Sequence, residues 1–471
     1  MEVSRRKFLT LAGTSAATVT MLSPLEAFYA KVARGEMPTS TGYGSLQEKL
    51  PLNTAELPAD LSGIPILKLP RAFKYTAFSI TGQPMDDGFT VARGHDGMAA
   101  FPGANNTTIL VRNHELRTSS SDPVQGGIKY STEAVGGTST LVVGADRRLI
   151  KHFNSLAGTI RNCAGGPTPW RTWISCEETF STTLNGSIRH GYNFEVIADP
   201  NSGLVNPVPL REMGRFNHEA VAVDPKTGYV YETEDRGDSC FYRFVPNVRP
   251  TKVGDLEKGG SLYALKVIGM NNFALNTINN PNFGGQPGLV KVGQTLPVEW
   301  VKIDNPDPDE ESSSAGVGVR YEAQSKGAAI FFRGEGAWYG NGLVYFVASQ
   351  GGPPVSSADN ARGNGQVWAY NPAREEITLV VEASPSGAFL QAPDNITVAP
   401  FGDLFVCEDG SGTDYIVGVN KKGEVYQFAM NNITSGELAG ACFSADGRTM
   451  FVNLQNPGIT VAIFGPWNRR R

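Results

Sequence analysis

The stretch PDNITVAPFGDLFVCEDG, residues 393–410, decides the fold. It starts with an acidic residue, Asp394, and continues with an alternating apolar strand, a turn containing Gly402, a second β-rich strand and a polar end. Period-two alternation interrupted by a glycine turn is the pattern of a β-hairpin. The same template recurs in three other stretches, HEAVAVDPKTGYVYETED (218–235), GEGAWYGNGLVYFVAS (334–349) and ELAGACFSADGRTMFVNLQ (437–455).

Two further stretches fit the template more loosely, DGMAAFPGANNTTILVRNHE (96–115) and NCAGGPTPWRTWISCEE (162–178). The six hairpins begin, mostly about 40–65 residues apart, at Asp96, Asn162, Glu219, Glu335, Asp394 and Glu437. This spacing is typical of propeller blades of four strands each. We therefore predict an all-β fold, a six-bladed β-propeller over residues 91–467, with unrelated hairpins in a sandwich or barrel as the alternative.

One interval, between Glu219 and Glu335, is about twice as long as the others and contains the loop-like stretches NNFALNTINNPNFGGQPG and NPDPDEESSSAGVG. Stretches so rich in Asn, Pro, Gly and Ser predict an insertion, at about residues 265–325, over one face of the propeller. Residues 31–90 are expected to form an N-terminal extension or part of the closing blade.

The N-terminal segment SRRKFLTLAGTSAATVTML carries twin arginines, Arg5 and Arg6, before a mildly apolar run. It resembles a twin-arginine export signal over residues 1–30, and the run is too short and polar for a stable membrane span. We expect a periplasmic or secreted protein that uses the twin-arginine export machinery; an ordinary basic N-terminus is the alternative. The net charge of −5 argues against a general basic surface for nucleic acid.

The propeller geometry would bring distant acids together. The innermost strand of each blade lines the channel, so hairpin starts should ring its mouth and hairpin ends should lie just outside that ring. Four residues at hairpin starts would then converge at the channel mouth: Glu219, Glu335, Asp394 and Glu437. Three pairs at hairpin ends would form the outer ring: Cys176–Glu177, Glu234–Asp235 and Glu408–Asp409. Carboxylates facing one another need cations, and Ca(2+) prefers oxygen ligands. Solvated acids on exposed rims are the alternative.

Two residues suggest further chemistry. Arg333 precedes Glu335 by two positions, so on a strand both side chains point the same way. The guanidinium is then placed to hold a phosphate oxygen beside a metal-binding carboxylate. A structural Arg–Glu pair is the alternative. In TWISCEETF, residues 172–180, Cys176 precedes two glutamates on opposite strand faces, of which we favour Glu177. Alone, Cys176 would be a buried strand thiol; beside a ring of acids it becomes a candidate metal ligand. Five widely spaced cysteines, with no CxxC, give no disulfide framework.

Taken in order, several motifs resemble the PhoX family of exported bacterial alkaline phosphatases, over about residues 85–465. They are RNCAGGPTPWRTWISCEET, GRFNHEAVAVDPKTGYVYETED, FFRGEGAWYGNGLVYF, APDNITVAPFGDLFVCEDG and ELAGACFSADGRTMFVNLQNPG. The resemblance implies a monomeric six-bladed propeller whose channel mouth holds a mixed cluster of iron, Fe(3+), and calcium, Ca(2+), that hydrolyses phosphate monoesters.

The resemblance also implies roles for individual residues. Arg333, Cys176 and Glu335 would be catalytic, and Arg333 would hold the phosphoryl group of the substrate. The metal ligands would be Cys176, Glu177, Glu219, Glu335, Asp394, Glu437 and Glu115. Two alternatives remain: a propeller hydrolase that uses calcium alone, lactonase-like or phytase-like, and a calcium-stabilised binding module without catalysis. The first explains the acids but gives Cys176 no role, and metal analysis separates the three.

Overall fold

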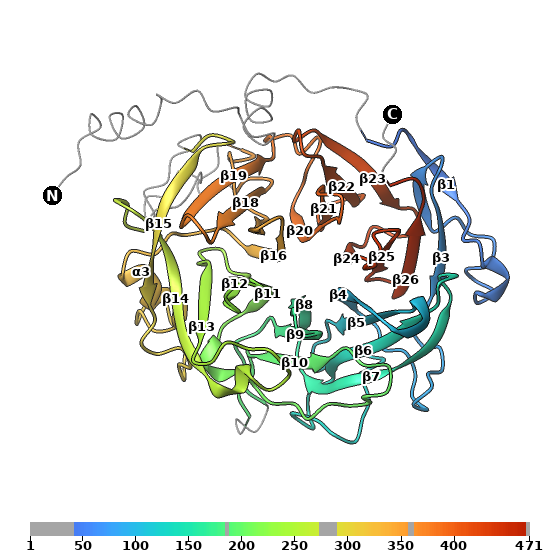
Figure 1. The fold of residues 1–471 in the computed structure, drawn as a ribbon, viewed down its shortest axis with the longest axis horizontal. Coiled ribbons are helices and arrows are strands. Elements are labelled where there is room, and N and C mark those ends of the chain that lie inside the picture. Colours follow the sequence, from blue (N-terminus) through green and yellow to red (C-terminus); the bar gives the residue numbers. More distant parts are fainter. Residues whose placement is uncertain (1–41, 184–187, 273–289, 357–361, 468–471) are drawn as a thin grey trace.

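The structure, a computed structural model, describes residues 42–183, 188–272, 290–356 and 362–467. The twin-arginine segment and residues 273–289 of the expected insertion lie outside the described residues. The described chain is almost entirely β-structure, with sheets arranged like the blades of a propeller around a centre (Figure 1). It contains one α-helix, α3 (Val319–Ser325), and four short 3-10 helices, η1 (Thr54–Glu56), η2 (Ala104–Asn106), η3 (Arg211–Met213) and η4 (Leu256–Lys258).

The strands form successive antiparallel groups along the chain. The first two groups are β4 (His95–Pro102), β5 (Thr108–His114), β6 (Gly136–Val143) and β7 (Leu149–Thr159), then β8 (Asn162–Pro167), β9 (Thr172–Glu177) and β10 (Asn193–Ile197). The next run is β11 (His218–Val223), β12 (Val230–Glu234), β13 (Tyr242–Pro246), β14 (Gly260–Val267) and β15 (Thr295–Lys302). It is followed by β16 (Gly334–Gly340), β17 (Leu343–Ala348), β18 (Gln366–Asn371) and β19 (Glu376–Glu382).

The last groups include strands from both ends of the chain. They are β20 (Pro393–Val398), β21 (Leu404–Glu408), β22 (Tyr415–Val419) and β23 (Val425–Asn431), extended by β2 (Leu67–Pro70) and β1 (Leu46–Lys49), then β24 (Leu438–Phe443), β25 (Thr449–Leu454), β26 (Ile459–Phe464) and β3 (Lys74–Phe78). Within the expected insertion, β15 pairs with both β14 and β19 and so joins two groups into one nine-stranded sheet.

The first strand of each group lies nearest the centre (Figure 1). In the described chain these inner strands contact one another in a closed ring, in the order β4, β8, β11, β16, β20, β24 and back to β4. Apolar side chains fill the space between neighbouring groups; Val347 and Val367, for example, pack against Val406 and Val417. Burial of these surfaces between sheets stabilises the ring. The predicted all-β, propeller-like fold is confirmed.

Small residues let the inner strands approach closely at the centre. Each inner strand has a register shift near its start, as a β-bulge gives. A β-carbon on Gly336 would lie 2.7 Å from the carbonyl oxygen of Asp394, and one on Gly440 would lie 2.4 Å from that of Asp96. These glycines therefore set how near the acids of neighbouring strands come. Among the described helices, none has the length and apolarity needed to cross a membrane.

Candidate metal centre

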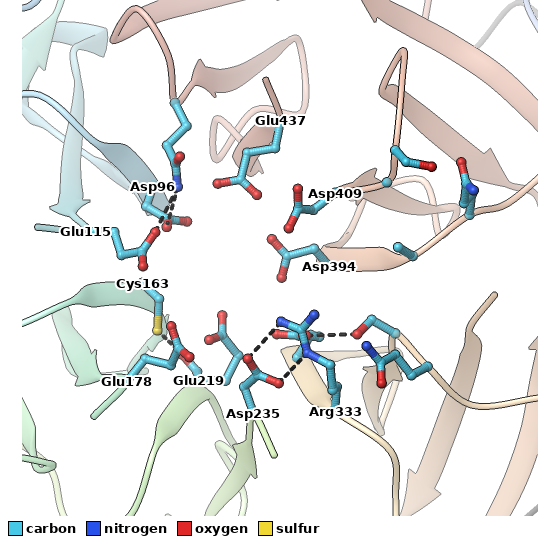
Figure 2. Close-up of a pocket in the computed structure, with 18 of the residues that line it drawn as sticks. Asp96, Glu115, Cys163, Glu178, Glu219, Asp235, Arg333, Asp394, Asp409 and Glu437 are labelled. Atoms are coloured by element: carbon cyan, nitrogen blue, oxygen red, sulfur yellow. Dashed lines mark hydrogen bonds and ion pairs between the residues drawn. The ribbon is translucent and has the colours of Figure 1, made fainter. Parts of the chain in front are cut away.

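A cavity of about 620 Å³ opens at the end of the ring where the inner strands begin (Figure 2). One cysteine thiol and four arginines line it, Cys163, Arg117, Arg161, Arg333 and Arg362. The carboxylates that line it are Asp96, Glu115, Glu178, Glu219, Asp235, Glu335, Asp394, Asp409 and Glu437. Nine carboxylates against four guanidinium groups leave five excess negative charges when all are ionised. A cluster of this charge favours bound cations or protonated carboxyl groups.

The inner strands supply the first set of ligands. Five of the six place their second residue, at the bulge, into the cavity, and these residues are Asp96, Cys163, Glu219, Glu335 and Asp394. In β24 the register places Ala439 at this position. Glu437, two residues earlier, reaches the cavity instead. The repeat therefore fixes the position, and each strand varies the chemical group there.

The hairpin ends supply the second set. The residue that directly follows the second strand of each hairpin lines the cavity in every group, and these residues are Glu115, Glu178, Asp235, Ser349, Asp409 and Gln455. Four are acidic, whereas Ser349 and Gln455 are neutral. Ser349 donates a 2.8 Å hydrogen bond from Oγ to Glu335 Oε1, and Gln455 Nε2 donates to Glu115 Oε2 at 3.0 Å. The neutral members thus orient neighbouring carboxylates.

Two arginines directly precede inner strands and hold carboxylates in place. Arg161 and Arg333 have φ values of 51° and 55°, a left-handed conformation that is strained for a non-glycine residue and recurs at functional sites. Arg333 donates from Nε and Nη2 to the two oxygens of Asp235, at 2.6 and 2.8 Å. Arg161 donates from Nε to Glu115 at 3.0 Å and pairs with Glu178.

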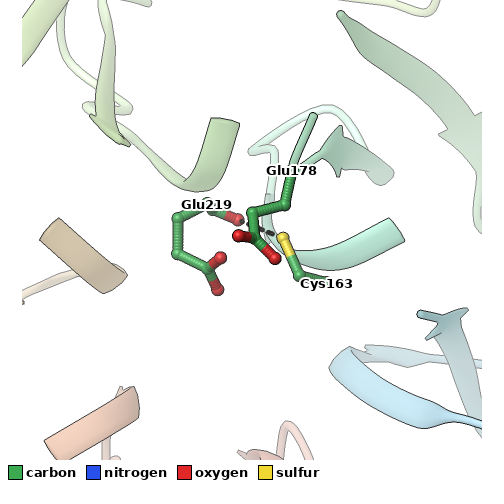
Figure 3. A group of neighbouring side chains, drawn as sticks. All are labelled: Cys163, Glu178 and Glu219. Carbon is green, nitrogen blue, oxygen red and sulfur yellow. Dashed lines mark hydrogen bonds between the residues drawn. The ribbon is translucent and has the colours of Figure 1, made fainter. Parts of the chain in front are cut away.

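Three groups of side chains have ligand atoms within 4.8 Å of one another. They are Cys163 with Glu178 and Glu219; Asp96 with Glu115 and Glu437; and Glu219 with Glu335 and Asp394. Figure 3 shows the first group, in which the Glu178 carboxylate lies beside the sulfur and the Cys163 thiol donates to the backbone carbonyl oxygen of Glu219. The two all-oxygen groups suit hard cations such as Ca(2+), whereas the thiolate suits a transition metal. The residues present therefore fit a mixed metal cluster.

The electrostatics of the cavity also fit bound cations. Burial, with a smaller contribution from Glu115, raises the pKa of Asp96, and burial raises the pKa of Asp394 to about 7. Burial raises the pKa of Glu178 to about 9, although Arg161 opposes this rise. Burial, followed by the nearby Glu219, raises the pKa of the Cys163 thiol. A cation would reverse these shifts because it favours the ionised ligands.

Six of the predicted site residues line the cavity: Glu115, Glu219, Glu335, Asp394, Glu437 and Arg333. The structure does not bring Cys176 and Glu177 there, which corrects the sequence-based choice of thiol and of adjacent carboxylate. Both belong to β9, the second strand of its hairpin, which lies between β8 and β10. The described lining comes instead from the starts of the inner strands, the residues at the hairpin ends and the loops beside them.

Each of these two side chains has a different environment. Cys176 is completely buried among apolar side chains such as Ile174 and Phe216, and burial raises the pKa of its thiol. Glu177 accepts hydrogen bonds from the backbone N–H groups of Ile160, at 2.9 Å, and Gly191, at 2.8 Å. It therefore joins the start of β8 to the segment before β10 and does not contact the cavity.

Cys163 and Glu178, which the sequence analysis did not select, can be identified from their positions in the repeat. When CAGG at 163–166 is aligned with EAVA at 219–222 and DGMA at 96–99, Cys163 takes the position of the acids Glu219 and Asp96. The repeat therefore begins at Cys163, one residue after the predicted start at Asn162. Likewise, in the outer pairs the second residue faces the cavity, Asp235 and Asp409 rather than Glu234 and Glu408. The same rule selects Glu178 over Glu177.

Comparison with known proteins agrees with this geometry. A family model described as alkaline phosphatase PhoX matches residues 52–458. Among solved structures, the chain is similar to PhoX of Pseudomonas fluorescens in complex with vanadate, a transition-state analogue, with 18% identity, a TM-score of 0.64 and coverage of 91% of this chain and 98% of that one. A sequence search among curated proteins gives no match.

Two more distant structures share a weaker likeness. A gluconolactonase of Xanthomonas campestris has 13% identity, a TM-score of 0.36 and coverage of 80% and 87% of the two chains. A virginiamycin B lyase of Staphylococcus aureus has 12% identity, a TM-score of 0.37 and coverage of 83% and 99%. These two likenesses are too weak to bear on the function.

Proposed function

This chain belongs to the PhoX family of alkaline phosphatases, whose activity is the metal-dependent hydrolysis of phosphate esters, and we propose that it hydrolyses phosphate monoesters in the central cavity. The observation that carries the proposal is the meeting of nine carboxylates, a thiol and Arg333 in one cavity. The vanadate complex of the Pseudomonas protein supports a phosphoryl-transfer transition state at such a centre. The closed ring of inner strands supports a six-bladed propeller.

We propose that Fe(3+) and Ca(2+) are the metals. Cys163, with Glu178 and Glu219, would hold iron, because a buried thiolate is a soft ligand that calcium does not favour. The two all-oxygen groups would hold calcium, Asp96 with Glu115 and Glu437, and Glu335 with Asp394 and the shared Glu219. When bound, these cations act as Lewis acids that stabilise charge on the phosphoryl oxygens.

Arg333 is the residue that would bind the phosphoryl group. Asp235 fixes its Nε and Nη2, and Glu335 lies 3.2 Å from Nη2. Its Nη1 has no partner among the described residues and is available for a substrate oxygen. Asp235 raises the pKa of Arg333 through its hydrogen bonds, so the guanidinium stays charged. A fixed cation of this kind stabilises the negative charge of the transition state without reorganisation.

We also propose that the protein is monomeric and exported by the twin-arginine route. The twin arginines Arg5 and Arg6 support this proposal. Replacement of both by lysine should retain the protein in the cytoplasm, as cell fractionation would measure. Export of the doubly substituted protein at the normal level would contradict the proposed route.

The proposed function is tested with protein exported by its native route. Its iron and calcium content is measured together with turnover of 4-nitrophenyl phosphate. Arg333→Ala should lower kcat/KM by about a hundredfold or more, the scale found when one transition-state donor is removed. Arg171→Ala is the matched control, because Arg171 is also left-handed, with φ 67°, but lies outside the cavity lining, bonded to Pro102. Equal activity of both variants would refute the assignment of Arg333.

A further inference from the structure

One wall of the cavity differs from the rest because, among the residues that the structure describes, it carries no carboxylate. The loop between β17 and β18 contributes Ser349, Gln350, Val355, Arg362, Gly363 and Asn364 to the lining, so this wall offers amide, hydroxyl and guanidinium groups. It adjoins Arg333, since Ser349 N–H donates to the Arg333 carbonyl oxygen at 2.9 Å. A substrate held by Arg333 therefore has this neutral-to-positive wall beside it.

Arg362 is held in this wall by packing. Its Cζ lies 4.2 Å from the centre of the Phe332 ring, and Phe332 is the neighbour of Arg333 in sequence. The loop is held by backbone hydrogen bonds from Gly363 N–H to the Gln350 carbonyl oxygen, at 3.0 Å, and from Gln350 N–H to the Phe332 carbonyl oxygen, at 3.1 Å. These contacts keep the Arg362 guanidinium close to the phosphoryl-binding arginine.

Among the described residues the Arg362 guanidinium forms no ion pair, and Asp238 is the one carboxylate whose charge acts on it from a greater distance. Its Nη1 is buried without a hydrogen-bond partner in this part of the chain. The other arginines close to the metal ligands, Arg161 and Arg333, each contact two carboxylates. A buried donor left unpaired costs free energy, and a planar guanidinium matches a carboxylate or phosphate with two parallel hydrogen bonds.

We propose that Arg362 binds a second anionic group on the alcohol part of the substrate, an inference that rests on the proposed function. The cavity, at about 620 Å³, has room for an alcohol group as well as a phosphoryl group. The preferred substrates are then phosphate monoesters whose alcohol carries a carboxylate or a further phosphate, with Arg333 on the transferred group and Arg362 on the second anion.

The test compares two esters that differ in one group. 2-Phosphoglycolate has a carboxylate, and 2-hydroxyethyl phosphate has an uncharged hydroxymethyl group in its place. The measured quantity is the ratio of their kcat/KM values. Arg362→Gln should lower this ratio about tenfold to a hundredfold, the value of a charge-assisted hydrogen bond. Arg362→Lys keeps the positive charge but not the two parallel N–H donors of the guanidinium, so its ratio should lie between those of Arg362→Gln and the unsubstituted protein. A purely structural role for Arg362 would change stability and leave the ratio unchanged.

Arg117→Gln is the matched control, because Arg117 also lines the cavity but is exposed and belongs to the β5–β6 connection. It should not lower the ratio. The inference would be wrong if the ratio stayed unchanged in both Arg362 variants, or if it fell equally in Arg117→Gln. In either case, turnover of 2-hydroxyethyl phosphate would still support the phosphatase function. Failure of the unsubstituted protein to hydrolyse either ester would overturn the proposed function as well.

Discussion

The two cysteines Cys163 and Cys176 give a sharp test of the metal site, because they are chemically identical, both buried and near each other in the fold. Cys163 Sγ lies 3.9 Å from the Cys176 carbonyl oxygen. Yet only Cys163 lines the cavity, within ligand distance of Glu178 and Glu219. Serine replaces each thiol with a smaller, harder ligand atom. Cys163→Ser should therefore change metal content and activity, and Cys176→Ser should change stability.

The magnitudes follow from the two environments. Substitution of groups that merely support a metal ligand costs about tenfold to a hundredfold in affinity or activity. Loss of the Cys163 thiolate itself should cost about a hundredfold or more in kcat/KM, with iron content well below that of the unsubstituted protein. Cys176 is fully buried among apolar side chains, so a hydroxyl there costs about 1–3 kcal/mol unless it finds a partner. Its thermal midpoint should fall by a few degrees.

The assay measures iron and calcium by elemental analysis, the thiolate-to-iron charge-transfer absorption, kcat/KM for 4-nitrophenyl phosphate and thermal unfolding, all on the same preparations. Cys163→Ser should lose the absorption band and Cys176→Ser should keep it. The reasoning fails if Cys176→Ser loses iron and activity while Cys163→Ser keeps both. In that case the thiol chosen from the sequence, not the one chosen from the fold, would be the ligand.

Three further outcomes are expected. Gly440→Ala should unfold at a lower temperature, because its φ of 63° and the 2.4 Å approach to the Asp96 carbonyl oxygen leave no room for a β-carbon. Gly342→Ala, with φ 82° and open space around it, should cost less, and an equal cost would contradict the argument. Metal-free protein should lose thermal stability as the pH rises from about 5 to about 9. Burial gives Asp394 and Glu178 pKa values of about 7 and about 9 in the folded state, so in this range the folded state binds more protons than the unfolded state. Added Ca(2+) should reduce this loss, and a flat profile in chelator would refute it.

The fold could be predicted from the sequence because its repeat is local. Each hairpin template combines an acid, an alternating strand and a glycine turn within about 20 residues, and these patterns depend on neighbours along the chain. The convergence of Glu219, Glu335 and Asp394 followed from the repeat, since equivalent positions of a ring must meet. β3, by contrast, pairs with β26 from the other end of the chain, and no local pattern reveals that contact.

The choice between neighbouring residues could not be made from alternation alone. Alternation says that Glu177 and Glu178 face opposite ways, but not which face turns toward the cavity. The answer depends on where β9 ends, because Glu177 pairs with Asn162 as the last strand residue and Glu178, the next residue, pairs instead with Asn217. The same applies to Cys163, whose direction is set by the bulge that follows Asn162. A one-residue uncertainty at a strand end therefore reverses the assignment.

The repeat also explains how one architecture can build an asymmetric site. The position directly before an inner strand carries Arg161 before β8, Arg333 before β16 and Glu437 before β24, whereas Gly94 and Ala392 hold it before β4 and β20. The fold supplies equivalent positions, and the residue in each decides which charge, if any, stands at that point of the ring.

This arrangement couples metal binding to folding. The inner strands pack closely only where small residues such as Gly336 allow it, and this packing forces buried carboxylates together. Their mutual repulsion and burial oppose the folded state when they are ionised, so ions that neutralise them contribute stability as well as catalysis. The close approach at Gly336 therefore gives both the packing that stabilises the ring and the repulsion between Glu335 and Asp394. Bound cations would make the two compatible with one fold.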